Sequence, residues 1–137
     1  MGLRLRGSAP ADSDLALACG LAAGRLAIGA GLWLAPNLTL GALGFGKLDP
    51  NAMALARIAA TRDLALGAWM IDARHDRERL GRAAIAVAAC DAGDTIAFAL
   101  LARGGGQSKF AGLRGVAAAG PATAAGAFLA TRLLGRS

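Results

Sequence analysis

Residues 56–67 read ARIAATRDLALG. This stretch places Arg57, Arg62 and Asp63 in the middle of a segment that is otherwise apolar enough to cross a membrane. An Arg or Asp at mid-span costs about 2.5–3.5 kcal/mol on an insertion scale, whereas a large apolar residue contributes about 0.3–0.6 kcal/mol. We therefore expect neighbouring helices to supply charges that neutralise this segment. Charge at bilayer depth is also, by default, a candidate functional site.

The composition of the whole chain predicts a membrane protein. Of its 137 residues, 55% are hydrophobic and 18% charged, and the mean hydropathy is +0.49; a soluble domain carries about a quarter charged residues. The apolar residues gather in four blocks of roughly 20, the length that crosses ~30 Å of hydrocarbon. We expect an all-α fold, a four-transmembrane-helix antiparallel bundle, with a soluble alanine-rich bundle as the alternative. Residues 1–14 would be a cytoplasmic lead and 15–134 one membrane domain, with spans at about 15–34, 53–71, 83–101 and 113–134.

The segments between these blocks predict where the helices begin and end. Ser13 or Asp14 would cap the first helix, and Pro36 would end it because proline cannot continue a helix. Residues 36–52 are too short and glycine-rich to cross, which predicts a short interfacial or re-entrant connector, closed by Asp49-Pro50-Asn51 as a turn and N-cap. The charged residues 72–82 and the glycine-rich residues 103–109 are expected to form loops.

Small residues and one proline mark the first and last spans. Gly120-Pro121 predicts a kink in the last span. A small-residue stripe on the first span is of the kind that lets helices approach closely in lipid; it consists of Gly20, Gly24, Ala27 and Gly31.

The basic residues predict the orientation in the membrane. Eight of them fall on one side, namely Arg4, Arg6, Arg74, Arg77, Arg79, Arg82, Arg132 and Arg136. Four fall on the other side, namely Lys47, Arg103, Lys109 and Arg114. Because the side richer in Lys and Arg faces the cytoplasm, both termini are expected to be cytoplasmic.

Charged residues on three of the spans coincide in depth. The centre of span 15–34 falls beside Arg25, that of 53–71 at Arg62, and that of 83–101 between Asp91 and Asp94. At 1.5 Å per residue, these four residues and Asp63 lie within roughly 3 Å of one plane. We expect an ionic layer in which Arg62 meets Asp91 or Asp94 and Asp63 faces Arg25.

Two further polar residues lie beside this layer. Arg57 is about 140° around the helix from Arg62 and about 7.5 Å further toward the outer side, so we expect it to be peripheral. Thr95 shares one face of its helix with Asp91 and Asp94. The candidate ligand-binding residues are therefore Arg25, Arg62, Arg57 and Thr95.

The ionic layer suggests either chemistry or a structural clasp. It holds two arginines and three carboxylates, so one carboxylate is in excess unless Arg57 reaches it. In a low dielectric, an extra carboxylate could hold or move a proton, which makes Asp91, Asp94 and Asp63 the candidate catalytic residues. Alternatively, the paired charges only fix the register of the helices.

Several classes of function are excluded. The chain has one histidine, His75, and its two cysteines, Cys19 and Cys90, have no metal-ligand spacing, so no metal and no cofactor is expected. The net charge of +6 comes without aromatic residues interleaved to stack on bases, so no nucleic-acid partner is expected.

Three motifs carry a resemblance to a known family. They are GR-x-x-x-G at Gly24 with a following Pro36, RD-x-x-x-G at Arg62, and D-x-x-D at Asp91. In this order the chain resembles the small four-helix DoxX-like bacterial membrane proteins of unknown function. The resemblance implies four spans and a multi-pass protein of the inner (cytoplasmic) membrane, but it implies no activity. A few such proteins are similar to quinone-linked oxidoreductase subunits, whereas this chain has no redox ligand set.

Three functions are compatible with this sequence. In the first, the ionic layer binds, and acts by acid–base chemistry on, a lipophilic small molecule such as a quinone, an isoprenoid or a lipid. In the second, the protein is a proton-coupled transporter or channel that works as a dimer. In the third, it is a structural or accessory subunit of a larger membrane complex. The expected partners are membrane lipid, such a small molecule, and a second copy or a larger complex.

Overall fold

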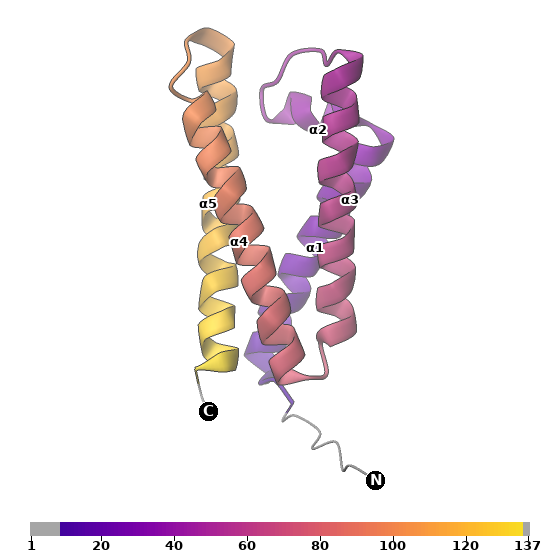
Figure 1. Ribbon diagram of the computed structural model, residues 1–137, viewed down its shortest axis with the longest axis vertical. Helices are drawn as coiled ribbons and strands as arrows, with labels where there is room; N and C mark the ends of the chain where they lie inside the picture. Colours follow the sequence, from indigo (N-terminus) through magenta and orange to yellow (C-terminus); the bar gives the residue numbers. More distant parts are fainter. Residues whose placement is uncertain (1–8, 136–137) are drawn as a thin grey trace.

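The computed structural model describes residues 9–135, and the elements it contains there are all α-helices. They are α1 (Asp12–Leu34), α2 (Pro36–Ala42), α3 (Pro50–Ala73), α4 (Arg77–Leu101) and α5 (Gly106–Leu134). The four long helices run up and down along one axis, and α2 lies at one end (Figure 1). The prediction of an all-α fold is confirmed. Residues 1–8 of the predicted N-terminal lead, with Arg4 and Arg6, and Arg136 near the other end, lie outside the described residues.

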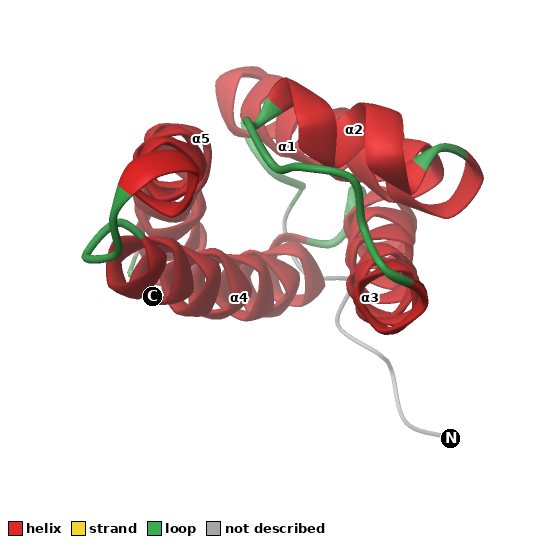
Figure 2. Cartoon of the chain, turned by 90° about the horizontal axis from the view of Figure 1, so that it is seen from above, coloured by secondary structure: helices red, strands yellow, loops and turns green. Residues whose placement is uncertain are grey.

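The long helices form two pairs, α1 with α3 and α4 with α5 (Figure 1). The pairs lie together at the end that holds the turn between α3 and α4, and they diverge toward the end that holds α2 (Figure 1). We call residues 12–24, 64–90 and 124–135 the closed half, and residues 26–61 and 95–123 the open half. Seen from the open end, α4 lies between α5 and α3, with α1 and α2 opposite (Figure 2).

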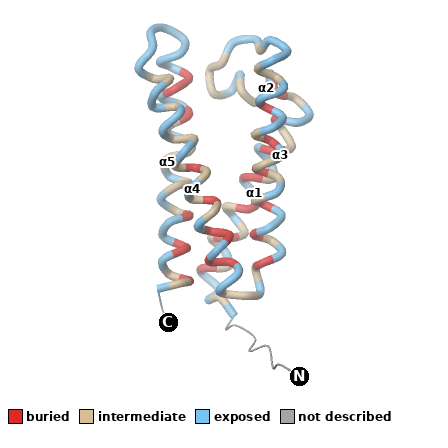
Figure 3. The backbone as a smooth tube through the Cα atoms, in the orientation of Figure 1, coloured by how far each residue is buried: buried red, intermediate tan, exposed pale blue. Residues whose placement is uncertain are grey.

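The closed half contains the larger core of the protein. Met70, Leu80, Val87 and Leu129 come from three helices and are at most 1% exposed. Alanines fill the space between the backbones, with Ala18 and Ala22 on α1, Ala73 on α3, Ala83 and Ala84 on α4, and Ala130 on α5. Buried residues are accordingly concentrated in this half in Figure 3. The small side chains allow the two helix pairs to approach closely here.

Two glycines bring α1 and α3 together. A Cβ on Gly29 would lie 2.8 Å from Leu64 Cγ, and a Cβ on Gly67 would lie 2.9 Å from Leu26 Cγ. Leu64 of α3 thus packs on Gly29 of α1, and Leu26 of α1 packs on Gly67 of α3, at positions where only glycine leaves enough space. The predicted stripe does not make this contact, since Cβ atoms on Gly20 and Gly24 would meet nothing within 4 Å and Ala27 is exposed. Its last member, Gly31, lies against Thr39 of α2.

The predicted caps are correct at one helix and wrong at another. Asp49 caps α3, since its Oδ1 accepts a hydrogen bond of 2.8 Å from Ala52 N. The first helix begins one or two residues before the predicted caps, at Asp12, and its N-cap Ala11 makes no side-chain hydrogen bond. Asp14 does not cap because its side chain is buried in an ion pair with Arg132 of α5.

Two predicted loops are shorter than expected. Within 72–82, α3 continues to Ala73 and α4 begins at Arg77, because Asp76 caps it by accepting from Arg79 N at 3.0 Å. Glu78 and Arg82 then pair one turn apart on α4, which favours the helix. In the second predicted loop, α5 begins at Gly106 and continues through Pro121 without a break in the helix.

The predicted connector is confirmed as a short, non-spanning segment. Pro36 follows the end of α1 and begins α2, which ends at Ala42. Phe45, in the segment after α2, lies with its ring centroid 6.3 Å from that of Phe98 on α4. Arg114 of α5 donates a hydrogen bond of 2.8 Å to the carbonyl of Ala42. The connector therefore bridges the two helix pairs at the open end.

Two of the four predicted spans are long and apolar enough, by length and composition, to cross a membrane. They lie in α1 and α4, and 28% and 17% of their most apolar stretches are buried inside the protein. Large apolar side chains are exposed on both helices, among them Ile28 on α1 and Ile85 and Ile96 on α4. The apolar stretch of α3 is interrupted by Arg57, Arg62 and Asp63.

Candidate functional site

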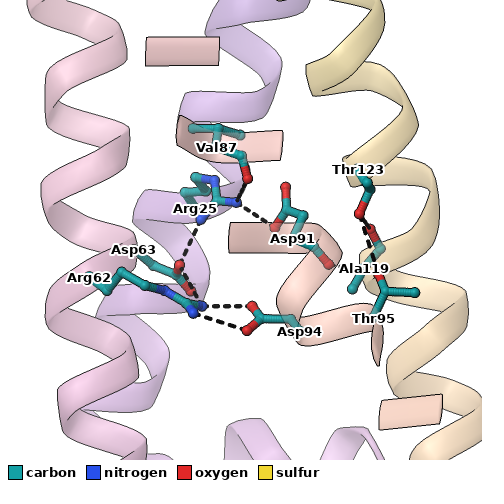
Figure 4. Close-up of polar contacts among 9 residues, drawn as sticks. All are labelled: Arg25, Arg62, Asp63, Val87, Asp91, Asp94, Thr95, Ala119 and Thr123. Carbon is teal, nitrogen blue, oxygen red and sulfur yellow. Dashed lines mark hydrogen bonds and ion pairs between the residues drawn. The ribbon is translucent and has the colours of Figure 1, made fainter. Parts of the chain in front are cut away.

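The inner part of the ionic layer is a triad centred on Arg25 of α1. Its Nη1 donates a hydrogen bond of 2.7 Å to Asp63 Oδ1 on α3, and its Nη2 donates to Asp91 Oδ1 on α4 (Figure 4). Nη2 also donates to the carbonyl of Val87 at 3.3 Å. The side chains of Arg25, Asp63 and Asp91 are only 8–10% exposed. Buried charges are tolerated when paired and hydrogen-bonded, so this triad ties α1 to both neighbouring helices.

The outer part of the layer is an ion pair between Arg62 of α3 and Asp94 of α4. The guanidinium binds both carboxylate oxygens, with Nη1–Oδ1 at 2.9 Å and Nη2–Oδ2 at 2.6 Å. Nη2 also lies 3.3 Å from Asp63 Oδ1, which connects the pair to the triad (Figure 4). The two side chains are 35% and 33% exposed. The layer thus has a buried part and an accessible part.

The structure brings together the five residues that were predicted to lie at the same depth, Arg25, Arg62, Asp63, Asp91 and Asp94. Of the two carboxylates expected for Arg62, it meets Asp94, and the predicted pairing of Asp63 with Arg25 is confirmed. Asp91 pairs with Arg25 instead of Arg62, because the guanidinium of Arg25 reaches carboxylates on both α3 and α4.

The other two candidates lie outside this network. Arg57 stacks over the ring of Trp33, with its guanidinium carbon 5.8 Å from the ring centroid, which agrees with its expected peripheral position. Thr95 Oγ1 donates to the carbonyl of Asp91 at 2.7 Å and lies 3.3 Å from Thr123 Oγ1 of α5. Thr95 therefore lies at the contact between α4 and α5 (Figure 4).

The surroundings of Arg62 and Asp94 differ on their two sides. Ile58 and Leu55, one and two turns from Arg62 along α3 toward the open end, are both 67% exposed. Met70, two turns away in the other direction, is 1% exposed and belongs to the core of the closed half. The accessible ion pair thus lies where the packed core ends and the helix pairs begin to diverge.

A separate hollow lies at the open end. It is an open pocket of about 180 Å³, and its lining carries no charged side chain: Gly44, Phe45, Gly46, Leu101, Gln107, Ser108 and Ala111. None of the predicted site residues belongs to it.

An ion pair between α1 and α5, outside the ionic layer, was not predicted from the sequence. Arg132 Nε of α5 lies 2.7 Å from Asp14 Oδ1 of α1, and the Asp14 side chain is 3% exposed. Both residues lie at span ends on the same side of the bundle, so depth counting applied to the ends as well as the centres could have found this pair.

Potential metal ligands are not clustered in the described part of the chain. Between residues 9 and 135, no three His, Cys, Asp or Glu side chains are grouped as a metal ion would require. The three aspartates of the ionic layer are held by arginines instead.

Comparisons with known proteins add no family. No family model, curated protein or solved structure matches this chain. The resemblance to DoxX-like proteins therefore stays a prediction, and any function has to be argued from the ionic layer.

Proposed function

We propose that the protein is a four-span integral membrane protein in which α1, α3, α4 and α5 cross the bilayer. The 24 and 29 residues of α3 and α5 exceed the roughly 20 that a span requires. Two of the three charges that make α3 unfavourable alone, Arg62 and Asp63, are paired within the bundle, and Arg57 stacks on Trp33. Large apolar side chains are also exposed on all four helices, where lipid would cover them; they include Ile28, Ile58, Ile85, Ile96, Leu113 and Phe128.

The closed end faces the cytoplasm in this arrangement. Five of the eight basic residues counted on the cytoplasmic side belong to described residues at that end, namely Arg74, Arg77, Arg79, Arg82 and Arg132. The ionic layer then lies within the bilayer, and the open half extends from it toward the outer surface.

The accessible part of the layer binds the polar group of a lipophilic small molecule, such as a quinone, an isoprenoid or a lipid. The observation that carries this proposal is the one-third exposure of Arg62 and Asp94, next to an apolar surface that lipid tails also contact. Arg62 would donate hydrogen bonds to a carbonyl or an anionic group, and Asp94 would accept or supply a proton.

The buried triad has the clasping role in this proposal. Arg25 joins α1 to α3 and to α4, so it fixes the two helix pairs relative to one another. A stable triad would hold Arg62 and Asp94 in position for a ligand, because the triad and the pair share Asp63.

Binding to the reconstituted protein tests this function. Ubiquinone, geranylgeraniol and oleic acid, each in labelled form, would be titrated into wild-type protein in lipid nanodiscs. We expect at least one of them to bind and to lose at least tenfold in affinity in the Arg62→Gln variant. The Asp94→Asn variant provides a second test of the same pair.

The matched control is Arg79→Gln, which removes another Arg–Asp pair, to Asp72, that lies outside the layer and is exposed. This variant should bind like the wild type, and circular dichroism should show the same helix content in all variants. Equal binding by wild type, Arg62→Gln and Asp94→Asn, or binding to none of the three compounds, would contradict the proposal.

A further inference from the structure

The ionic layer has more acidic than basic groups. Two guanidinium groups, on Arg25 and Arg62, face three carboxyl groups, on Asp63, Asp91 and Asp94. Arg57 does not compensate the third carboxyl group, because it stacks on Trp33 outside the layer. With every group ionised, the layer would keep one uncompensated negative charge. Such a charge is costly in a low dielectric, and a carboxyl group avoids the cost by taking up a proton.

The hydrogen-bond donors are not shared equally among the three carboxyl groups. Asp94 receives two donors from Arg62, one on each oxygen. Asp63 Oδ1 receives two, one from Arg25 and one from Arg62. Asp91 receives one, on Oδ1, while its Oδ2 is buried and has no hydrogen-bond partner among the described residues.

We propose that the ionic layer is a proton-binding site and that Oδ2 of Asp91 holds the proton at neutral pH. The layer then contains two arginines, two carboxylates and one carboxylic acid, and it is electrically neutral. Asp91 can still accept the hydrogen bond from Arg25 on Oδ1, because a protonated carboxyl group keeps a carbonyl oxygen. The proposal goes beyond ligand binding and does not require a ligand.

All groups that face Asp91 are accounted for in this charge balance. Helix α1 presents Arg25, and α3 presents Arg62 and Asp63. Asp94 and Cys90 lie beside Asp91 on α4 itself. Helix α5 presents the Thr123 hydroxyl near Thr95 at this level, and its described charged residues lie toward its two ends, at Lys109, Arg114 and Arg132.

Infrared spectroscopy of the ligand-free full-length protein tests the proposal. A protonated carboxyl group has a C=O stretching band that is separate from the carboxylate bands and shifts in D₂O. We expect this band in the wild-type protein at neutral pH. Asp91→Glu should shift it, because the acid then belongs to a longer side chain, whereas Asp63→Glu and Asp94→Glu should leave its position unchanged.

A second variant keeps the test decisive if Asp91→Glu does not fold. Asp91→Asn has nearly the shape of the neutral acid and should keep the wild-type helix content while the band disappears. Absence of the band from the wild type, its persistence at full intensity in Asp91→Asn, or a shift caused only by Asp63→Glu or Asp94→Glu would overturn the proposal. None of these results depends on the binding of ubiquinone, geranylgeraniol or oleic acid, so this proposal and the proposed function fail separately.

Discussion

The closed half and the open half consist of the same four long helices, yet they differ in what lies between them. In the closed half, Leu80, Val87 and Leu129 are fully buried among alanines. In the open half, Leu55 and Ile58 are mostly exposed, and the connector bridges the two helix pairs at the far end. Small residues at the contacts allow close packing, whereas large apolar residues there hold backbones apart or turn to the surroundings.

The ionic layer lies at the boundary between these halves, and its two parts differ in burial as the two halves do. The Arg25 triad is enclosed, while Arg62 and Asp94 remain accessible. A single set of Arg–Asp pairs can therefore hold a bundle together on one side and present a polar site on the other. Mutations that compare the two sides can separate these roles.

The largest effect is expected from removal of the central charge of the triad. In Arg25→Gln, Asp63 and Asp91 lose their shared partner while remaining buried, which should lower the free energy of unfolding by about 3–5 kcal/mol. Arg62→Gln should cost less, since that pair is one-third exposed. Unfolding by a denaturing detergent, followed by circular dichroism, measures both. Equal losses would show that burial does not distinguish the two parts.

A smaller effect is expected from the apolar residues of the two halves. Leu80→Ala empties a fully buried position and should destabilise the protein by about 2–4 kcal/mol. Leu55→Ala removes the same atoms from a side chain that is 67% exposed, so its effect should stay within about 0.5 kcal/mol. The same unfolding measurement compares the two. A large loss from Leu55→Ala would mean that the open half is closed by another molecule or a second copy.

The smallest effect is expected from the charged turn at the closed end. Arg79 and Asp72 form an ion pair at 2.5 Å, but their side chains are 56% and 67% exposed. Arg79→Gln should change the free energy of unfolding by no more than about 1 kcal/mol, and less at high salt. A loss as large as that of Arg25→Gln would argue that ion pairs stabilise this protein irrespective of burial.

The ionic layer could be predicted from the sequence because mid-span charge is rare and its depth can be counted. Arg25, Arg62 and Asp94 each fall near the centre of an apolar block, so errors of a few residues in the block ends do not change their common depth. The angles around the helices placed Asp91 and Asp94 on one face of their helix, so they left open which of the two would meet Arg62.

The division into two halves could not be predicted in the same way. Leu80 lies among the charged residues 72–82 that were expected to form a loop, yet it is fully buried, whereas Leu55, in an apolar block, is 67% exposed. The residues around a leucine in the sequence therefore did not indicate which leucine would be packed. Similarly, the stripe at Gly20 and Gly24 indicated a close contact, whereas α3 packs on Gly29 and uses its own Gly67. The packing partner of a glycine depends on the positions of whole helices, which local spacing does not determine.

The ion pair between Asp14 and Arg132 has a consequence for the biosynthesis of the protein. Helix α1 carries Asp14 and Arg25, whose partners lie on helices that the ribosome makes later. Arg25 can pair with Asp63 once α3 has been made and with Asp91 once α4 has been made. The partner of Asp14, Arg132, is made only with the last turn of α5. The charges of the first helix are thus fully paired only once the final helix has been made, and a chain that ends before α5 would leave Asp14 uncompensated.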